Sequence, residues 1–401
     1  MNERLARIGN IPPRNEGMCE LSSKEDLTAP LRFRVIFTAR KFADVAGGLE
    51  RICIDLMNAL VGRGHSVALM TWDHAGAKTH YPLDGRVQWF KLDIGDADVT
   101  AGLRIKAARL RRFRGFVASF DPHAIVGFQS GAALFSRVAT IGMGKKIVAA
   151  ERVSPDMWRY VRTRFVDRMN DIYSLVLADR VTVQFPEYID KYPRILRRKM
   201  VAIHNPVHRS KPVQNVVDVG NSQVLLYVAR LCFQKNQKML IEAFARICGR
   251  FLDWKLVLVG DGEYAKLLRA KVSEMRLDER VVFCGAVKNV EAWYQAAQLV
   301  AFPSLFEGFP NSLAESLAWG LPCVGLKNTL GVNALIEDGV NGVLTHDGAE
   351  DFSAGLAALM GDKPRREWMG QNAKRISEAY PPEHSYSLWE ALITEVVSCR
   401  A

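Results

Sequence analysis

The sequence predicts an α/β protein made of two successive doubly wound parallel-sheet domains, and three observations support this prediction. The chain has 401 residues, enough for two or three domains of ordinary size. Short apolar, β-rich runs alternate with helical patterns, which favours parallel strands joined by right-handed crossovers. A polar stretch at 208–222 interrupts the alternation, which then starts again.

The first series of strands follows residues 1–30, which lack the apolar core of a signal peptide and are interpreted as a flexible tail. Strands are expected at 33–39, 66–72, 87–93, 124–129, 146–151, 180–184 and 200–207. Helical patterns lie between most of them, including 101–118 and a long one from about 155 to 177. These elements define an N-terminal domain over 31–207, and 208–222 is the expected linker.

The second series has expected strands at 224–229, 255–260, 280–285, 299–304 and 322–326. Helices are expected near 237–250, 263–275, 289–297 and 312–319, and again after residue 350. They define a C-terminal domain over 223–380, and residues 381–401 form one more helix.

The composition excludes several classes of protein. Hydrophobic residues make up 49% and charged residues 24%, which is ordinary for a globular chain. No run of about 18 apolar residues that could span a membrane is present. The seven cysteines include no C-x-x-C pair, which argues against a disulfide framework or a zinc site. A cytoplasmic protein without a bound metal is the expectation.

Positive charge is concentrated in the first half of the chain. The whole sequence has 54 basic and 43 acidic residues, and residues 1–205 hold 33 of the basic and 21 of the acidic ones. The first domain is therefore expected to meet an anionic partner. The predicted helix at 101–118, with Arg104, Arg111 and Arg112 on one side, is either an ordinary core helix or a membrane-surface helix. No nucleic-acid-binding motif accompanies the charge.

The most informative segment is PSLFEGFPNSLAESLAWGLP, residues 303–322. Glu307 lies in a Gly/Pro loop after a strand, and Glu315 lies eight residues later in a new helix that begins at Asn311 or Ser312. The N-terminus of such a helix is an anion site. The alternative is structural, because Ser312-x-x-Glu315 is also a capping box that would tie down the first turn.

Two further loops follow the first strand of each domain. Arg230 and Lys235, in YVARLCFQKN, follow a buried strand where a diphosphate-binding loop would lie, although a solvated basic loop is the alternative. Gly47 and Gly48, in DVAGGLE, would let backbone approach a ligand closely, or would simply form a tight turn.

Three other patterns are interpreted as structural. GDGEYA at 260–265 matches a dinucleotide fingerprint, but the next strand ends in Cys284-Gly285 instead of an acid, so a tight turn is expected. Asp96 and Asp98 are expected to be solvated turn residues. Pro206 separates His204 from His208 and disfavours a helix that would align both on one metal ion.

Together, AGGLE, VARLCFQKN, the VLVGDGE…VVFCGAV run and EGFPNSLAE resemble the retaining family-4 glycosyltransferases of GT-B fold, and the last motif is similar to their E-x7-E motif. The resemblance covers roughly residues 33–397 and implies two facing Rossmann-like domains with a cleft between them. It implies a nucleotide-sugar donor as co-substrate, no other cofactor and no metal.

The resemblance also implies roles for single residues. Arg230 and Lys235 match the basic pair that grips the donor diphosphate, Glu307 the residue beside the transferred sugar, and Glu315 the residue that hydrogen-bonds the ribose. The amides of Asn311 and Ser312 would contact phosphate or sugar, and Gly47 and Gly48 would face the diphosphate. The final helix resembles one that crosses back to the first domain.

Glu151 and Arg152, on the acceptor side, resemble part of a Ser-Glu-Arg-Asn segment in relatives that extend glycans on polyprenyl diphosphate carriers. The resemblance, with this pair and the charge asymmetry on the acceptor side, implies transfer of a hexose or N-acetylhexosamine from a UDP-linked donor to a lipid-linked saccharide, at the inner face of the cytoplasmic membrane. The chain departs from many relatives by lacking a histidine near the sugar site of the first domain. Two alternatives remain open: a GT-B epimerase or phosphorylase, and a non-catalytic protein that binds anionic lipid or nucleic acid.

Overall fold

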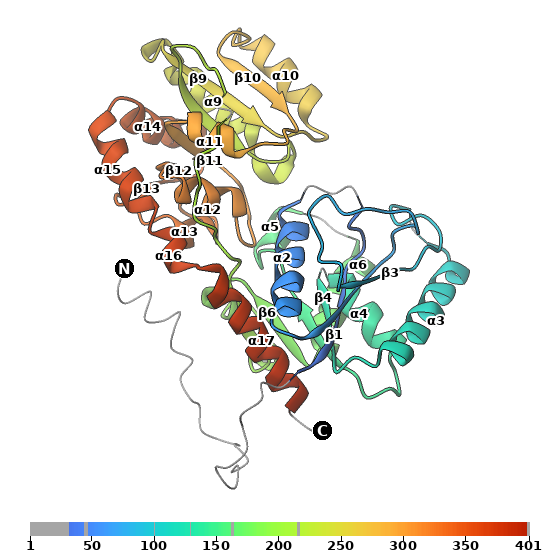
Figure 1. Ribbon diagram of the computed structural model, residues 1–401. Coiled ribbons are helices and arrows are strands. Elements are labelled where there is room, and N and C mark those ends of the chain that lie inside the picture. The colour runs from blue at the N-terminus through green and yellow to red at the C-terminus, as the bar shows by residue number, and fades with distance from the viewer. Residues whose placement is uncertain are drawn as a thin grey trace, which may run out of the picture. The chain divides into compact units, whose positions relative to one another are not determined.

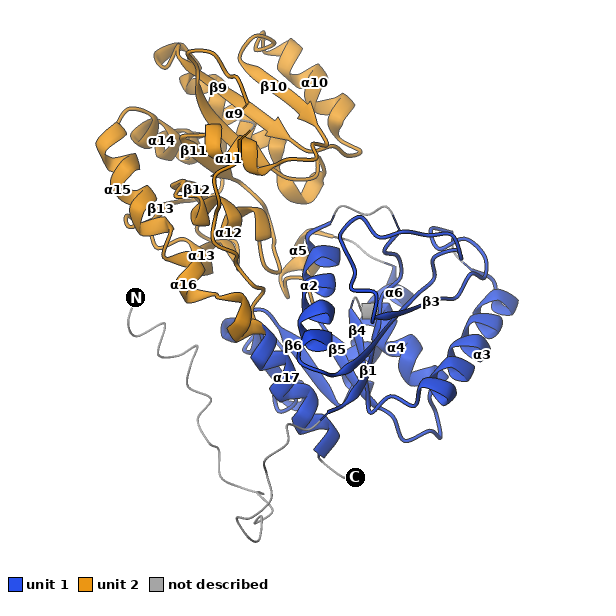
Figure 2. Cartoon of the chain, viewed as in Figure 1, with its two compact units in different colours: residues 1–151, 164–203, 386–401 blue, residues 152–163, 204–385 orange. Residues whose placement is uncertain are grey.

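The computed structural model describes residues 32–43, 47–99, 101–128, 130–161, 164–214 and 217–398. Within them the chain forms two compact units. Unit 1 comprises residues 1–151, 164–203 and 386–401, and unit 2 comprises residues 152–163 and 204–385 (Figure 2). The predicted tail, 1–30, lies outside the described residues.

Unit 1 is built on a parallel sheet whose seven strands are ordered β3-β2-β1-β4-β5-β6-β7. The strands are β1 Arg34–Thr38, β2 Ser66–Thr71, β3 Gln88–Lys91, β4 Ala124–Phe128, β5 Lys146–Ala150, β6 Arg180–Val183 and β7 Met200–Ala202. The helices are α2 Gly48–Gly62, α3 Leu103–Phe120, α4 Ser130–Ala139, α6 Phe165–Leu177, α7 Pro186–Ile189, α8 Arg194–Arg197 and α17 Pro382–Ser398. Every strand predicted for this domain is present.

Helices cover both faces of this sheet (Figure 1). Helix α4 packs between α3 and α6 on one face. Helices α2 and α17 pack on the other, where one buried cluster joins them to β1, β2, β4 and β5. Because both faces are buried, the central strands are continuous apolar runs instead of alternating ones, as parallel sheets require.

The last helix, α17, belongs to unit 1 from Tyr386 onward (Figure 2). Trp389 packs against Phe128 of β4, with ring centroids 5.7 Å apart. Glu390 accepts a hydrogen bond from Arg63 at 2.6 Å and contacts His65 at 2.7 Å. The helix is therefore held to unit 1 by a buried aromatic contact and by partly buried ion pairs.

Unit 2 has a six-stranded parallel sheet ordered β10-β9-β8-β11-β12-β13. The strands are β8 Gln223–Val228, β9 Trp254–Val259, β10 Val281–Gly285, β11 Leu299–Phe302, β12 Cys323–Leu326 and β13 Gly342–Thr345. The α-helices are α5 Met157–Tyr160, α9 Gln237–Ile247, α10 Ala265–Glu274, α11 Glu291–Ala296, α12 Asn311–Ala318, α13 Val332–Leu335, α14 Ala349–Met360, α15 Lys363–Ala373 and α16 Ile376–Ala379. The two 3-10 turns are η1 Phe233–Lys235 and η2 Cys248–Arg250. The sequence interpretation missed β13, although it predicted β11 and β12, which have the same length.

The segment between β5 and α6 differs from the sequence interpretation. One helix was expected from about 155 to 177, within a domain over 31–207. The structure instead has the single-turn α5 followed by the separate helix α6, and residues 152–163 are grouped with unit 2. The reason is a tertiary contact, because Tyr160 of α5 stacks on Phe306 of unit 2 with ring centroids 5.7 Å apart.

Among the described residues, none of the helices combines the length and the apolar content that crossing a bilayer demands.

The contact of Glu390 with Arg63 and His65 predicts a pH dependence of stability. Burial opposes ionisation, but hydrogen bonds from His65 and Arg63 hold the pKa of Glu390 below its ordinary value. Such a carboxylate stabilises the fold above its unfolded pKa, and this contribution is lost as the pH falls through the folded value. We expect Glu390→Gln to lower the Tm at neutral pH by about 2 °C. The difference from wild type should shrink in acid.

Calorimetry over a pH series checks this prediction. Glu395→Gln is the control, because Glu395 pairs with Arg180 but is 47% exposed, and exposed pairs contribute little. A Tm difference for Glu390→Gln that is equal at neutral and acidic pH would contradict the assignment.

Candidate active site

The order of strands in unit 2 determines where a ligand site can form. The chain runs outward in one direction through β8, β9 and β10, and in the other direction through β11, β12 and β13. Strands β8 and β11 are therefore neighbours at the point where the order reverses. In open α/β sheets, ligands bind outside the carboxyl ends of the strands at this point. The loops that leave β8 and β11 carry the predicted residues Arg230, Lys235 and Glu307.

Lys235 and Glu307 meet at this edge of the sheet. The Lys235 ammonium lies 2.5 Å from Oε1 of Glu307, and the two side chains are 17% and 6% exposed. Gln234 approaches the other carboxylate oxygen at 3.5 Å. A carboxylate with so little contact with water needs such a partner, because the low dielectric of the interior penalises an uncompensated charge. The pair joins two loops that are 72 residues apart in sequence.

A network of hydrogen bonds holds the two loops together. The backbone N–H of Leu305 donates to the carbonyl of Gln234 at 2.9 Å, and the Gln234 amide donates to the carbonyl of Phe306 at 2.7 Å. The buried Tyr227 hydroxyl lies 2.9 Å from the carbonyl of Lys235 and 2.9 Å from the Ser304 hydroxyl. Because a carbonyl only accepts, the phenol donates to Lys235 and accepts from Ser304.

The phenol of Tyr227 keeps its proton over the accessible pH range. Burial, and then the nearby charge of Glu307, raise the pKa of this hydroxyl well above its ordinary value. Its hydrogen bond to the carbonyl of Lys235 therefore persists, and the backbone that carries the ammonium stays in place.

Arg230 differs from Lys235, its predicted partner. It is exposed, and within the described part of the chain its guanidinium forms no hydrogen bond or ion pair. Its backbone is fixed, because the side-chain amide of Gln237 donates to its carbonyl at 2.9 Å. The structure thus places one cation of the predicted pair on Glu307 and leaves the other at the surface.

The GDGEYA segment, residues 260–265, packs against the backbone of the loop that carries Arg230. The N–H of Leu231 donates to the carbonyl of Asp261 at 2.9 Å. A Cβ on Gly260 would lie 2.0 Å from the carbonyl oxygen of Ala229, and one on Gly262 would lie 2.3 Å from that of Leu231. The two glycines are needed because one backbone packs directly on another. The prediction that this segment is a tight turn is confirmed, and the turn is also a support for the Arg230 loop.

Helix α12 presents its N-terminus after the Glu307 loop. It begins at Asn311, and no side chain caps it at Pro310. Ser312 is therefore inside the helix, so the capping box considered for Ser312 and Glu315 is not formed. Glu315 instead accepts a hydrogen bond at 3.0 Å from the buried Tyr294 hydroxyl, which also lies 3.3 Å from the carbonyl of Ser312. The first N–H groups of a helix have no acceptor within it, so those at the start of α12 can donate to another group.

A chain of hydrogen bonds connects Arg152 with α12. A guanidinium N–H of Arg152 donates to the side-chain oxygen of Asn205 at 3.0 Å, and the Asn205 amide donates to the side-chain oxygen of Asn311 at 2.9 Å. Asn205 is 6% exposed. Sequence reasoning missed Asn205, although its place in HNPV between two noted histidines was a signal.

Gly47, Gly48 and Glu151, the remaining predicted residues, lie in unit 1. Glu151 belongs to unit 1, whereas Arg152 belongs to unit 2, so the predicted acceptor-side pair is divided between the units. The carbonyl of Glu151 accepts a hydrogen bond at 2.7 Å from the buried Gln184 amide. Gly47 precedes α2 in an extended conformation and Gly48 is its first residue. Contact of these residues with a ligand stays a prediction.

The segments considered as metal motifs have other partners. Asp98 pairs with Lys41 at 2.6 Å, and its N–H donates to the side chain of Asp96 at 2.7 Å. His204 is buried beside His384, with ring centroids 5.4 Å apart, and burial lowers the pKa of His204 to about 4. No cluster of three or more potential metal-ligating side chains occurs among the described residues.

Comparison with known proteins places this site in a family. The family model described as Glycosyl transferases group 1 matches residues 213–376, which include both loops and α12. The chain is 26% identical over 363 residues to the Campylobacter jejuni protein named "GalNAc-alpha-(1->4)-GalNAc-alpha-(1->3)-diNAcBac-PP-undecaprenol alpha-1,4-N-acetyl-D-galactosaminyltransferase". That alignment covers 88% of this chain and 96% of the relative.

Two solved structures have the same fold. Sucrose-phosphate synthase of Thermosynechococcus elongatus superposes with a TM-score of 0.80 at 18% identity, covering 92% of this chain and 100% of that one. HepE of Anabaena, in complex with UDP and glucose, superposes with a TM-score of 0.72 at 19% identity, covering 91% of this chain and 100% of that one. The chain is therefore a glycosyltransferase of the GT-B fold, and its residues 213–376 match the family model of the glycosyl transferases group 1.

Proposed function

We propose that this glycosyltransferase transfers a hexose or N-acetylhexosamine from a UDP-linked sugar to a saccharide on a lipid carrier, with retention of configuration, at the inner face of the cytoplasmic membrane. The Lys235–Glu307 pair at the switch point of the sheet carries the proposal. Two relatives support it: the Campylobacter jejuni protein is named for an acceptor on PP-undecaprenol and an alpha linkage, and HepE was solved with UDP.

The proposed reaction needs positive charge where the diphosphate leaves. The bond between the anomeric carbon and the β-phosphate oxygen breaks, the acceptor oxygen bonds that carbon on the same face, and the acceptor proton passes to the departing phosphate. Lys235, Arg230 and the N–H groups at the start of α12 would stabilise the developing negative charge. Glu307 would hold the ammonium in position and lie beside the transferred sugar, while Glu315 would bind the ribose.

We infer that these groups replace a divalent metal ion, so that excess EDTA leaves the rate of transfer unchanged. Cations fixed by the fold need no reorganisation during the reaction, which is the main requirement for electrostatic catalysis. Loss of activity in EDTA that Mg²⁺ or Mn²⁺ restores would contradict this inference.

The donor is identified first by thermal stability. A nucleotide sugar that binds the native state raises its Tm, by an amount that corresponds to about 2.7 kcal/mol at a hundredfold excess over Kd. We expect UDP sugars, tested with GDP-mannose as the alternative, to raise the Tm, and one of them to support transfer to a lipid-linked saccharide with release of UDP. A rearranged sugar without transfer would instead indicate an epimerase.

Variants of the two cations should separate catalysis from stability. Lys235→Ala leaves the buried Glu307 carboxylate without its ammonium, so we expect a loss of about 3–5 kcal/mol in the free energy of unfolding. Arg230→Ala, at an exposed position, should change stability by less than about 0.5 kcal/mol. Both should lower kcat/KM by about 10²-fold or more, because each removes charge stabilisation at the diphosphate.

The double variant Lys235→Met/Glu307→Gln is the control for stability. It removes both charges, so it should unfold less readily than Lys235→Ala while remaining inactive. Full activity in both Arg230→Ala and Lys235→Ala would exclude the proposed site.

Asn205→Ala tests the hydrogen-bond chain to α12. We expect it to raise the KM for the donor by about 5- to 30-fold, because Asn311 loses the amide that orients it at the helix N-terminus. Asn341→Ala is the matched control, because Asn341 also uses both ends of its amide, with Glu337 and Leu335, in a different loop of unit 2. An equal change of KM in both variants, or a change of Tm alone in Asn205→Ala, would contradict a role in positioning.

A further inference from the structure

Helix α6 of unit 1 has an exposed apolar face. Six side chains on it are exposed, by fractions between 40% and 77%: Phe165, Val166, Ile172, Tyr173, Val176 and Leu177. At 3.6 residues per turn their positions fall within an arc of roughly 140°. A stripe of this width is normally buried, and neighbouring exposed apolar side chains mark an interaction site.

The exposed apolar face of α6 is not the side by which the helix packs within unit 1. Ser174 and Leu175, on the opposite side of α6, are buried, and α6 packs along α4. The side of α6 that is used within unit 1 therefore carries Ser174 and Leu175, and the exposed apolar face is not used there.

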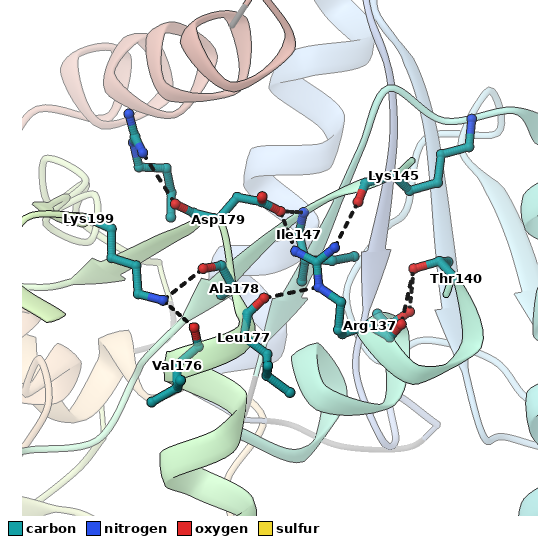
Figure 3. A network of polar contacts seen from close by, with 11 residues as sticks. Arg137, Thr140, Lys145, Ile147, Val176, Leu177, Ala178, Asp179 and Lys199 are labelled. Carbon is teal, nitrogen blue, oxygen red and sulfur yellow. Dashed lines mark hydrogen bonds and ion pairs between the residues drawn. The ribbon is translucent and has the colours of Figure 1, made fainter. Parts of the chain in front are cut away.

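The C-terminal end of α6 is held by cations (Figure 3). Lys199 donates to the carbonyl of Val176 at 2.6 Å and to that of Ala178 at 2.9 Å, and Arg137 donates to the carbonyl of Leu177 at 3.0 Å. These bonds satisfy carbonyls that have no partner within the helix and place positive charge at its negative end. The exposed face is thus presented by a fixed helix.

Basic side chains lie at both ends of this face. Arg164 and Arg168 are exposed at the start of α6, together with the acidic Asp167. Lys199, which follows α8, bonds the end of α6. Ile195 of α8 is 80% exposed. On the other side of α4, helix α3 carries the exposed Arg104, Arg111 and Arg112.

We propose that the exposed face of α6 docks unit 1 onto an anionic lipid bilayer. Apolar and aromatic side chains that lie along a helix, with arginines beside them, suit the boundary between acyl chains and anionic headgroups. The arginines beside this face match phospholipid phosphates in charge. The inference rests on the proposed function, because a lipid-linked acceptor brings the enzyme to a bilayer surface.

Vesicle flotation of the full-length protein tests this inference. We expect wild type to bind phosphatidylcholine vesicles that contain phosphatidylglycerol, more weakly as salt is added, and hardly to bind phosphatidylcholine alone. Phe165→Glu and Ile172→Glu should each lower the binding by about tenfold or more, because each puts a charge where an apolar side chain would enter the bilayer. Leu252→Glu is the matched control, because Leu252 lies in unit 2 and is 77% exposed, as Phe165 is; it should bind as wild type does.

Three results would overturn the inference: absence of vesicle binding by wild type, unchanged binding by Phe165→Glu and Ile172→Glu, or self-association of wild type that these variants abolish, which would make a second copy the occupant. The rise in Tm with a UDP sugar is measured on the same variants and should be unchanged. Vesicle binding through α6 without any response to a nucleotide sugar would instead refute the proposed function alone.

Discussion

The site in unit 2 depends on the reversal of strand order between β8 and β11. Only there do two loops that are far apart in sequence leave the sheet side by side, without a helix crossing between them. This brings the ammonium of Lys235 to the carboxylate of Glu307, and the pair is too buried for either charge to be left alone. The hydroxyl of Tyr227 and the backbone bonds between the loops serve to keep this pairing in register.

The positive charge of unit 1 has two different uses, which the structure separates. Some cations act inside the unit: Arg114 donates to the carbonyls of Ala139 and Ile141 at the end of α4, and Lys199 does the same at the end of α6. Others, such as Arg111 and Arg112 of α3, are exposed. A net charge summed over the sequence mixes both groups, so only the second group bears on an anionic partner.

The candidate site in unit 2 is also shaped by two segments that the sequence interpretation assigned to the N-terminal domain. Arg152, from the connection after β5, and Asn205, from the segment after β7, both join unit 2 and form a chain of hydrogen bonds to Asn311. The orientation of α12 therefore depends on three stretches of chain that no local pattern connects. Glu151, although adjacent to Arg152, is held by Gln184 in unit 1.

The amino-acid sequence alone determined the two-sheet α/β architecture, all but one of the strands, and the loops that carry Arg230, Lys235 and Glu307, because strand periodicity, glycines and chain order are local properties. Tertiary structure decided what periodicity cannot express. The carboxylate of Glu307 faces Lys235, and Glu315 bonds Tyr294 instead of capping its helix. The helix expected at about 155–177 is divided into α5, whose Tyr160 packs on Phe306, and α6, which exposes an apolar face. These outcomes depend on which distant segments come into contact. Strand pairing and side-chain burial determine those contacts, and both are complete only when the whole chain has folded.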